Sequence, residues 1–310
     1  MRRLHIETPL LEFQSVNNKV NGNAWLKMES IQPTGSFKIR GIGFACREYS
    51  AGGAAKLVTS SGGNAGLAVA YSGRKLGIPV IVVVPKTTTE RAKDLIKLEN
   101  AEVIVKGNTW QEAHQFALDL SDDDTAYIHP FDDPLIWNGH STLIDEVKQS
   151  GLKPDAIVLS VGGGGLLCGV LQGMEKNGWN DIPVVAVETL GADSFHQSVQ
   201  TGKLVELDEI TSIASSLGAK KVSQTALDWV KKHKIFSHTV SDKEALEACI
   251  KFSIDHRIIV EPACGASLSV LYNEIDFLRN KCTILVIVCG GVGATMEQLY
   301  NWYNKIIEQE

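Results

Sequence analysis

The stretch Thr283-Ile284-Leu285-Val286-Ile287-Val288 gives the strongest strand signal in the chain and decides its fold class. Unbroken runs of β-branched and aliphatic residues are typical of strands that are covered on both faces, because neither face has to meet water. Such strands occur in mostly parallel sheets with helices on each side. The run therefore predicts an α/β fold.

Strands and helices alternate along the rest of the chain. The expected strands lie at 23–28, 56–59, 80–84, 102–105, 126–128, 156–159, 184–187 and 283–288. The expected helices lie at 65–76, 90–98, 110–120, 142–149, 166–175, 225–232, 243–256 and 265–272, and 189–219 is more irregular. Acidic residues and prolines at 132–134 punctuate this alternation. We expect two lobes, each a mostly parallel open sheet flanked by helices, with 37–132 as the small domain and 1–36 with 133–310 as the large domain.

The composition favours a soluble protein that acts on a small molecule. Of 310 residues, 44% are hydrophobic and 21% are charged, which are ordinary globular values. No run of about 18 apolar residues is present, so we expect no transmembrane helix. A net charge of −6 and the lack of a dense Lys/Arg cluster provide no electrostatic footprint for nucleic acid or an anionic membrane.

The cysteines and the amino terminus point to a cytoplasmic protein. The six cysteines are scattered without a C-x-x-C pair. That distribution is typical of reduced thiols rather than of a disulfide framework or a zinc site. Arg2 and Arg3 are not followed by the apolar segment of a signal peptide.

Small residues follow the expected strand at 56–59, in the stretch Ser60-Ser61-Gly62-Gly63-Asn64-Ala65-Gly66. They would let a ligand approach backbone N–H groups at the start of the next helix, where an anion is favoured. The alternative is an ordinary turn in which Asn64 caps the helix. The residues themselves leave both interpretations open.

Four consecutive glycines follow the expected strand at 156–159, in Ser160-Val161-Gly162-Gly163-Gly164-Gly165-Leu166. Because such a run is costly in conformational entropy, a phosphate cradle of backbone amides explains it better than a plain loop. A dinucleotide fingerprint fails on spacing, since G-x-G-x-x-G begun at Gly162 places Leu167 at the third glycine. The chain also lacks the G-x-x-x-x-G-K-[ST] motif of nucleoside-triphosphate sites.

The stretch Pro33-Thr34-Gly35-Ser36-Phe37-Lys38-Ile39-Arg40-Gly41 places a lysine beside an aromatic ring at the start of a helix. Burial against apolar neighbours disfavours the charged form of an amine, as a covalent bond to an aldehyde cofactor requires. The alternative is an ordinary solvated lysine. Cys289 follows the 283–288 strand and is either a small buried hydrophobe or a polar atom directed at a ligand.

A lysine, an Asn-bearing loop, a phosphate cradle and a polar atom at a strand end match the aldehyde, ring hydroxyl, phosphate and ring nitrogen of pyridoxal 5′-phosphate. The chain resembles the fold-type II pyridoxal-phosphate enzymes, the tryptophan synthase β-like family, and within it the catabolic L-serine/L-threonine dehydratases. The resemblance runs through nearly the whole chain. Besides the stretches quoted above, it is carried by Glu7-Thr8-Pro9-Leu10, His129-Pro130-Phe131-Asp132-Asp133-Pro134, Glu261-Pro262-Ala263-Cys264-Gly265 and Val288-Cys289-Gly290-Gly291.

This resemblance implies a role for each candidate residue, with the cofactor in a cleft between the lobes and bound mainly by the large domain. Lys38 would anchor the cofactor and act as the base at Cα, while a neutral thiol at Cys289 would face the ring nitrogen. The implied cofactor-binding residues are Phe37, Lys38, Asn64, Gly162, Gly163, Gly164, Gly165 and Cys289. The implied substrate-binding residues are Ser61, Gly62, Gly63 and Asn64.

The implied reaction is β-elimination of L-serine to pyruvate, or of L-threonine to 2-oxobutanoate, with release of ammonia. The alternatives are a serine racemase or a β-replacement synthase on the same scaffold, and a binding protein without activity. Gly62 departs from the family pattern, in which alanine or serine stands there, and a glycine has no side chain to deliver a proton for racemisation. Ser216 stands where the resemblance places a small side chain against the ring.

The resemblance also implies a monovalent cation, K⁺, and a homodimer. Oxygen ligands suit such a hard cation. The implied ligands are Glu188, Ala192, Ser194, Leu217, Ala219 and Gly162. The alternative for Glu188 is a solvated carboxylate at the end of a strand, and both stay open. The length of 310 residues leaves no room for an added regulatory domain, which favours a catabolic enzyme without allosteric feedback.

Overall fold

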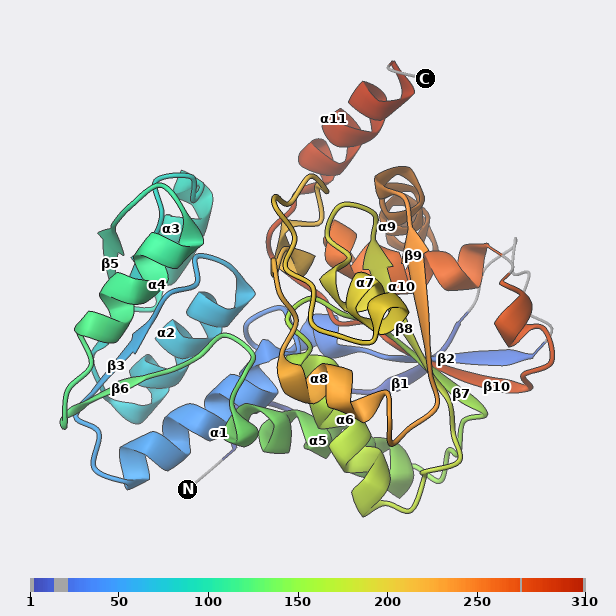
Figure 1. The fold of residues 1–310 in the computed structure, drawn as a ribbon, viewed down its shortest axis with the longest axis horizontal. Coiled ribbons are helices and arrows are strands. Elements are labelled where there is room, and N and C mark those ends of the chain that lie inside the picture. Colours follow the sequence, from blue (N-terminus) through green and yellow to red (C-terminus); the bar gives the residue numbers. More distant parts are fainter. Residues whose placement is uncertain (1–2, 14–21, 274, 309–310) are drawn as a thin grey trace. The chain divides into compact units, whose positions relative to one another are not determined.

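The computed structural model describes residues 3–13, 22–273 and 275–308, which form two compact units (Figure 1). Unit 1 comprises Met1–Ile6 and Gln32–His140, and unit 2 comprises Glu7–Ile31 and Ser141–Glu310. The domain boundaries expected from the sequence stay a prediction. Met1 and Arg2, where a signal peptide would begin, lie outside the described residues.

Unit 1 contains a fully parallel sheet with the strand order β5-β4-β3-β6. Its strands are β3 (Lys56–Thr59), β4 (Val80–Val84), β5 (Glu102–Val105) and β6 (Thr125–Tyr127). Its helices are α1 (Lys38–Ala51), α2 (Asn64–Leu76), α3 (Glu90–Leu98) and α4 (Trp110–Asp119). Parallel pairing directs the carboxyl ends of all four strands to one edge of the sheet.

Both faces of the unit 1 sheet are covered. Leu57 of β3 packs with buried side chains of α1, α2 and α3, including Ile42 and Ile96. The next residue, Val58, packs with Ala113 and other side chains of α4. Because successive side chains of a strand point to opposite faces, α4 lies on the face opposite to the other three helices.

Unit 2 contains a six-stranded sheet with the order β1-β2-β10-β7-β8-β9. Its strands are β1 (Leu10–Glu12), β2 (Asn23–Lys27), β7 (Ala156–Ser160), β8 (Val184–Thr189), β9 (Ile235–Val240) and β10 (Thr283–Ile287). Only the β1–β2 pair among these is antiparallel. β10 lies between β2 and β7 and is buried from Ile284 onward, as the unbroken hydrophobic run predicts. The expected α/β class with two mostly parallel sheets is therefore confirmed.

Helices cover the unit 2 sheet on both sides. Figure 1 shows α6 on one side, and α9 and α10 on the other. The helices are α5 (Pro134–Gln149), which crosses the unit boundary, α6 (Gly165–Lys176), α7 (Ser194–Thr201), α8 (Gln224–Trp229), α9 (Asp242–His256), α10 (Pro262–Tyr272) and α11 (Met296–Ile307). The short 3-10 helices are η1 (Glu29–Ile31), η2 (Ser215–Leu217) and η3 (Asp276–Leu278). The helix expected at 142–149 was therefore too short, because α5 already begins at Pro134, where proline suits a first helical turn.

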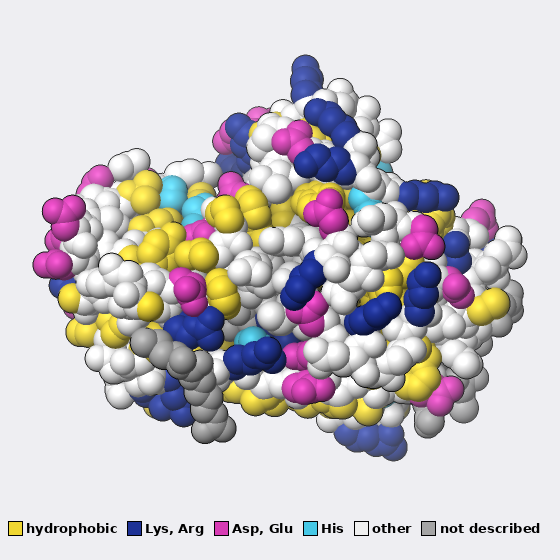
Figure 2. Space-filling view, turned by 90° about the horizontal axis from the view of Figure 1, so that it is seen from below, with side chains coloured by type: hydrophobic (Ala, Val, Ile, Leu, Met, Phe, Trp, Pro, Cys, Tyr) yellow, Lys and Arg dark blue, Asp and Glu magenta, His cyan; other side chains and the backbone are white. Residues whose placement is uncertain are grey.

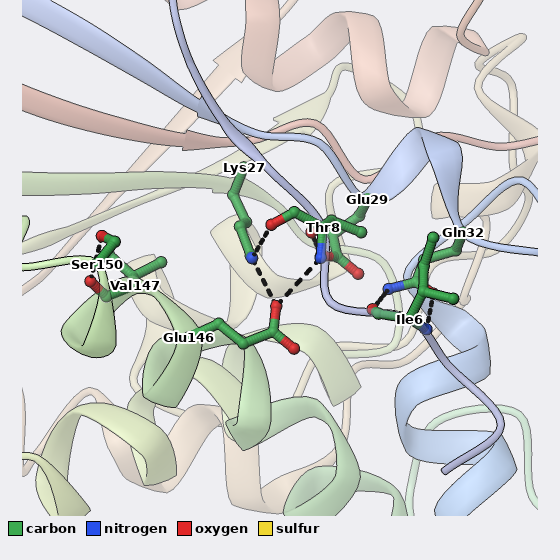
Figure 3. A network of polar contacts seen from close by, with 8 residues as sticks. All are labelled: Ile6, Thr8, Lys27, Glu29, Gln32, Glu146, Val147 and Ser150. Carbon is green, nitrogen blue, oxygen red and sulfur yellow. Dashed lines mark hydrogen bonds and ion pairs between the residues drawn. The ribbon is translucent and has the colours of Figure 1, made fainter.

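A buried ion pair ties three segments of unit 2 together (Figure 3). Lys27 Nζ lies 2.5 Å from Glu146 Oε2 of α5 and donates a hydrogen bond to Thr8 O at 2.6 Å. The Thr8 hydroxyl in turn donates to Glu29 Oε1 at 2.6 Å. All four residues are buried, so these charges are compensated inside the protein rather than by water.

No helix among the described residues is long and apolar enough to cross a membrane. On the face of the molecule shown in Figure 2, basic and acidic side chains are interspersed.

Candidate active site

Lys38 is the first residue of α1 and lies at the carboxyl edge of the unit 1 sheet. Its amine donates a hydrogen bond to Pro130 O at 2.6 Å, and Pro130 follows β6. The amine also lies 5.3 Å from the centroid of the Phe37 ring, and the neighbouring Ile39 is fully buried. Lys38 is half-buried, so the alternative of a fully solvated lysine does not describe its surroundings.

The Asn-bearing loop connects β3 to α2, also at the carboxyl edge. The N-cap of α2 is Gly63, without a side-chain cap, and Asn64 is the first helical residue and is buried. The alternative in which Asn64 serves as the helix cap is therefore wrong. A Cβ on Gly66 would lie 1.7 Å from Ser61 O, so the loop can close over the helix start only with glycine at this position.

Gly62 of this loop is crowded by a side chain. A Cβ on Gly62 would lie 2.6 Å from Thr88 Cγ2 and 2.9 Å from Thr88 Oγ1. The Ser61 hydroxyl turns back into the loop and accepts a hydrogen bond from Gly63 N–H at 3.3 Å. Thr88 therefore occupies the space that a side chain at position 62 would need, which is consistent with the glycine at this position.

A polar cluster behind the loop was missed by the sequence analysis. The hydroxyls of Ser60 and Tyr127 lie 2.8 Å apart, and His114 Nδ1 lies 2.8 Å from the Tyr127 hydroxyl and 3.3 Å from that of Ser60. Ser60 follows β3 and Tyr127 ends β6, so the pairing of these two strands brings their side chains together. Their positions at strand ends were the available signal.

His129 shapes the turn that presents Pro130 to Lys38. Its Nδ1 accepts hydrogen bonds from the backbone N–H groups of Phe131 at 3.2 Å and Asp132 at 2.7 Å. The ring proton therefore resides on Nε2. Burial, with smaller effects from His114 and Lys38, lowers the pKa of His129 to about 4 and keeps the ring a neutral acceptor.

The glycine run of unit 2 joins β7 to α6. Gly164 is the N-cap of α6 and has φ of 92°, a conformation that favours glycine. A Cβ on Gly164 would lie 2.6 Å from Ala226 Cβ, and one on Gly162 would lie 3.0 Å from Ser216 O. Gly163 O accepts a hydrogen bond from Ser223 N–H at 3.1 Å. A helix N-terminus preceded by bare backbone is suited to hold a phosphate.

Cys289 follows β10 in unit 2 and is buried. A hydrogen bond with Cys264, together with burial, raises the pKa of the Cys289 thiol well above its ordinary value, so the thiol is neutral. Glu261 closes the loop that follows, because its Oε2 accepts a hydrogen bond from Gly293 N–H at 3.0 Å. Gly291, at φ of 120°, has no room for a Cβ beside the same carboxylate.

Glu188 is fully buried, so the alternative of a solvated strand-end carboxylate is wrong. Its two oxygens accept hydrogen bonds from Phe195 N–H at 2.9 Å and His196 N–H at 2.6 Å, at the start of α7. Burial outweighs these two donors and raises the pKa of Glu188 to about 8. Glu188 thus serves as a hydrogen-bond acceptor for backbone N–H groups at the N-terminus of α7. Binding of a cation by Glu188 stays a prediction.

Three of the other expected cation ligands, Ser194, Leu217 and Ala219, are joined by hydrogen bonds in the same unit. The Ser194 hydroxyl donates to Ala219 O at 2.9 Å, and Ala219 N–H donates to Leu217 O at 2.7 Å. Ala192 N–H donates to Thr189 O at 2.9 Å. Within the described ranges, no group of three or more His, Cys, Asp or Glu side chains could hold a metal ion.

The candidate residues divide between the two units. The Asn-bearing loop, the glycine run and Cys289 follow the carboxyl ends of parallel strands, where open α/β sheets bind ligands, whereas Phe37 and Lys38 stand at the start of α1. Unit 1 contributes the lysine, the aromatic ring and the Asn-bearing loop. Unit 2 contributes the glycine run and the thiol. A cleft that joins the two sets stays a prediction.

These residues fit pyridoxal phosphate, because an amine 5.3 Å from the centroid of an aromatic ring, a glycine run in which a Cβ on Gly164 would collide with Ala226, and a neutral thiol are all present. The family model described as "Pyridoxal-phosphate dependent enzyme" matches residues 1–290. The chain belongs to this family.

Individual relatives within this family are similar to the chain over nearly its whole length. It is 48% identical over 309 residues to an L-serine dehydratase/L-threonine deaminase of Bos taurus, covering 96% of this chain and 94% of that protein. It is 46% identical over 319 residues to an L-serine dehydratase of Dictyostelium discoideum, covering 96% and 91%. The solved structure of an L-serine ammonia-lyase from the fungus Rhizomucor miehei superposes with a TM-score of 0.93 at 38% identity, covering 98% of this chain and 99% of that one.

Proposed function

We propose that this protein is an L-serine/L-threonine ammonia-lyase that depends on pyridoxal phosphate. It converts L-serine to pyruvate and ammonia, and L-threonine to 2-oxobutanoate and ammonia. The observation that carries this proposal is the 48% identity to the Bos taurus L-serine dehydratase/L-threonine deaminase, which extends over 96% of the chain. The substrate is thus a free amino acid.

In this proposal the residues of unit 1 bind and activate the substrate. When bound, pyridoxal phosphate supplies an electron sink for the charge that develops at the substrate's Cα. Lys38 would hold the cofactor through its aldehyde and would act as the base that takes the proton from the substrate's Cα. The backbone of the loop at 61–64 binds the substrate carboxylate, Asn64 holds the ring hydroxyl and Phe37 covers one ring face.

The residues of unit 2 hold the remainder of the cofactor. The amides of the glycine run bind the phosphate, and the neutral thiol of Cys289 faces the ring nitrogen. A thiol with its proton retained leaves that nitrogen largely unprotonated, which suits elimination better than transamination. This division of roles is supported by the buried, neutral state of the thiol and by the lack of room for a Cβ at Gly164 of the glycine run.

The remaining expectations belong to the same proposal. The enzyme works as a cytoplasmic homodimer, binds K⁺ through the Glu188 set, and contacts neither nucleic acid nor membrane. The small domain is 37–132, and the large domain, 1–36 with 133–310, is the one that mainly binds the cofactor. A racemase or a β-replacement synthase is the alternative, and the lack of a side chain at Gly62 favours the lyase over the racemase.

The test begins with the purified protein, which should be yellow and lose its absorption band when borohydride fixes the cofactor to Lys38. Pyruvate release from L-serine and 2-oxobutanoate release from L-threonine should follow. A colourless protein that added cofactor does not change would refute both the lyase and its alternatives. A yellow protein that releases neither 2-oxo acid would favour the synthase or the racemase.

A further inference from the structure

The first turn of α1, which carries Lys38, is held by a residue far along the chain. Phe37, the N-cap, has no side-chain cap, and Arg40 N–H closes back on Phe37 O at 3.0 Å. The next backbone donor, Gly41 N–H, points to His140 Nδ1 at 3.2 Å. A helix that lacks a local cap thus has its N–H group satisfied by an imidazole of α5.

Two glycines make this contact possible. A Cβ on Gly41 would lie 2.5 Å from Ile136 O and 2.7 Å from the His140 ring, and a Cβ on Gly139 would lie 2.4 Å from Arg40 O. α1 and α5 therefore approach each other so closely that neither can carry a side chain at the crossing. The imidazole of His140 is fixed against the backbone of α1, within reach of its N–H group.

The same imidazole packs against Phe37. The two ring centroids are 4.9 Å apart with the planes at 50°, and His140 is fully buried. One side chain thus contacts the residue before Lys38 and the backbone three residues after it. Displacement of His140 would remove a packing partner of Phe37 and the acceptor of Gly41 N–H, which flank Lys38 in the sequence.

In this position, one polar atom of His140 has no hydrogen-bond partner among the described residues. Because Nδ1 is an acceptor, the proton of the neutral ring resides on Nε2. That Nε2 is buried and has no hydrogen-bond partner among the described residues. Burial, followed by Lys38, Arg40 and His5, lowers the pKa of His140 well below its ordinary value, so the ring stays neutral and Nδ1 remains an acceptor. An unsatisfied buried donor destabilises the native state, so the position of His140 is expected to have a function that offsets this cost.

We propose that His140 is a positioning residue for the reaction, in which its neutral imidazole orders the first turn of α1 and the Phe37 ring so that the Lys38 amine is correctly directed. The inference rests on the proposed role of Lys38. The positioning itself is a property of unit 1 and is measurable without turnover.

The decisive comparison is between His140→Asn and His140→Leu in the holoenzyme. The two side chains have nearly the same shape, but only Asn retains an oxygen near the position of Nδ1 that can accept from Gly41 N–H. A mis-set catalytic group typically loses about 10²-fold in rate, so His140→Leu should lower kcat by roughly that factor with little change in the KM for L-serine. His140→Asn should retain most of the activity.

Hydrogen exchange of the peptide that contains residues 37–42 provides a readout that does not depend on activity. Exchange should accelerate in His140→Leu and stay near wild type in His140→Asn. His233→Ala serves as the control, because His233 is similarly buried in unit 2 and bonds to Ile182 O at 2.7 Å. It should lower the melting temperature without changing kcat or the exchange of 37–42.

Equal kcat and equal exchange in the Leu and Asn variants, whether both are impaired or both normal, would overturn the positioning role. If the wild type itself releases no 2-oxo acid, the proposed function fails instead, and the exchange of 37–42 still decides whether His140 orders the turn.

Discussion

The amine of Lys38 donates a hydrogen bond to the carbonyl oxygen of Pro130 at 2.6 Å. The turn that presents this carbonyl is fixed by His129, whose ring accepts two backbone N–H groups. The Lys38 amine therefore has a defined place in unit 1, next to the Phe37 ring.

Replacing Lys38 with alanine should abolish turnover. The change removes the covalent anchor and the base at Cα together, so we expect kcat to fall by at least about 10³-fold. Lys75→Ala is the matched control, because this exposed lysine lies near Tyr71 on α2 and has no part in the proposed site. Mass spectrometry after borohydride treatment should find the cofactor on the Lys38 peptide of the wild type and of the control. Elimination of L-serine by Lys38→Ala at near wild-type rate would show that another residue is the anchor.

Gly164→Ala should weaken cofactor binding, and the loss of affinity should be larger than backbone strain alone would cause. Gly164 and Gly178 both have positive φ, at 92° and 70°, so alanine is strained at either position by about 1–2 kcal/mol. Only at Gly164 does the added Cβ meet a neighbour, Ala226 Cβ at 2.6 Å, whereas nothing lies within 4 Å at Gly178. Titration of the apoenzyme with pyridoxal phosphate should show at least about a tenfold higher Kd for Gly164→Ala, or 1.4 kcal/mol. Equal Kd values for the two variants would argue against the cradle.

The helices and strands that could be predicted from the sequence were those that a short stretch of residues identifies without knowledge of its tertiary neighbours. β10 reads as a buried strand because every residue from Ile284 to Ile287 faces a packed interior. β9 was missed because it lies at the edge of its sheet and carries polar residues such as His238. α7 was missed inside an irregular segment because it is short and its N-terminus is satisfied by Glu188 rather than by a local cap.

The candidate site follows the same rule. The lysine and the glycine run could be predicted because each stands next to a strand or helix end in a recognisable stretch. Ser60 and Tyr127 stand at strand ends, which was a signal, but their contact with each other and with His114 depends on the pairing of β3 with β6 and on the packing of α4 against the sheet. His140 was missed for a similar reason, since its contact with Gly41 depends on how closely α1 and α5 cross.

Glu188 should make the stability of the protein fall as the pH rises. Its pKa is about 8 in the native state and near 4.5 when unfolded, so the native state binds more protons between these values. The contribution of Glu188 to the free energy of unfolding is fully present below pH 4.5. It decreases as the pH rises toward 8, by about 1.4 kcal/mol per pH unit within that window. Melting temperatures measured between pH 5 and pH 8 should depend less on pH in Glu188→Gln than in wild type. Glu175→Gln, at an exposed glutamate of α6, should behave as wild type.

The same pair of proteins tests the cation. If K⁺ binds beside the ionised Glu188, potassium chloride at pH 8 should raise the melting temperature of the wild type above its value in tetramethylammonium chloride of equal ionic strength. Glu188→Gln should show no such difference. An equal response in both proteins would remove Glu188 from the proposed ligand set.

Removing one partner of the buried pair Lys27–Glu146 should strongly destabilise the protein. Glu146→Ala leaves the Lys27 ammonium buried beside Thr8 O, which typically costs about 3–5 kcal/mol. The double variant Lys27→Met with Glu146→Leu should recover much of that loss. Lys176→Met is the control, because it breaks the pair at 2.7 Å between the exposed Lys176 and the half-buried Asp145, and should cost less than about 1 kcal/mol. Urea unfolding of the wild type and the three variants measures these losses, and equal losses in Glu146→Ala and Lys176→Met would contradict the expected cost of the buried charge.

Gly62 should keep the enzyme a lyase with negligible D-serine formation. Racemisation requires a proton donor on the face of Cα opposite to the base, and the loop residue proposed to lie there has no side chain. Gly62→Ser alone is a poor test, because its Cβ would lie 2.6 Å from Thr88 Cγ2 and displace the loop. Combined with Thr88→Ala, which removes that methyl and the hydroxyl, the serine should fit once Val84 Cγ1, 3.2 Å from the added Cβ, shifts by a few tenths of an ångström.

The double variant Gly62→Ser with Thr88→Ala should therefore form D-serine from L-serine at the expense of pyruvate, whereas Thr88→Ala alone should not. Chiral chromatography of the residual serine during turnover measures this, and in ²H₂O the D-serine formed should carry deuterium at Cα. Appreciable D-serine from the unmodified enzyme would mean that another group supplies the proton. The Ser61 hydroxyl, which accepts a hydrogen bond from Gly63 N–H within the same loop, would be the first to test. The preference for a lyase over a racemase would then have rested on the wrong residue.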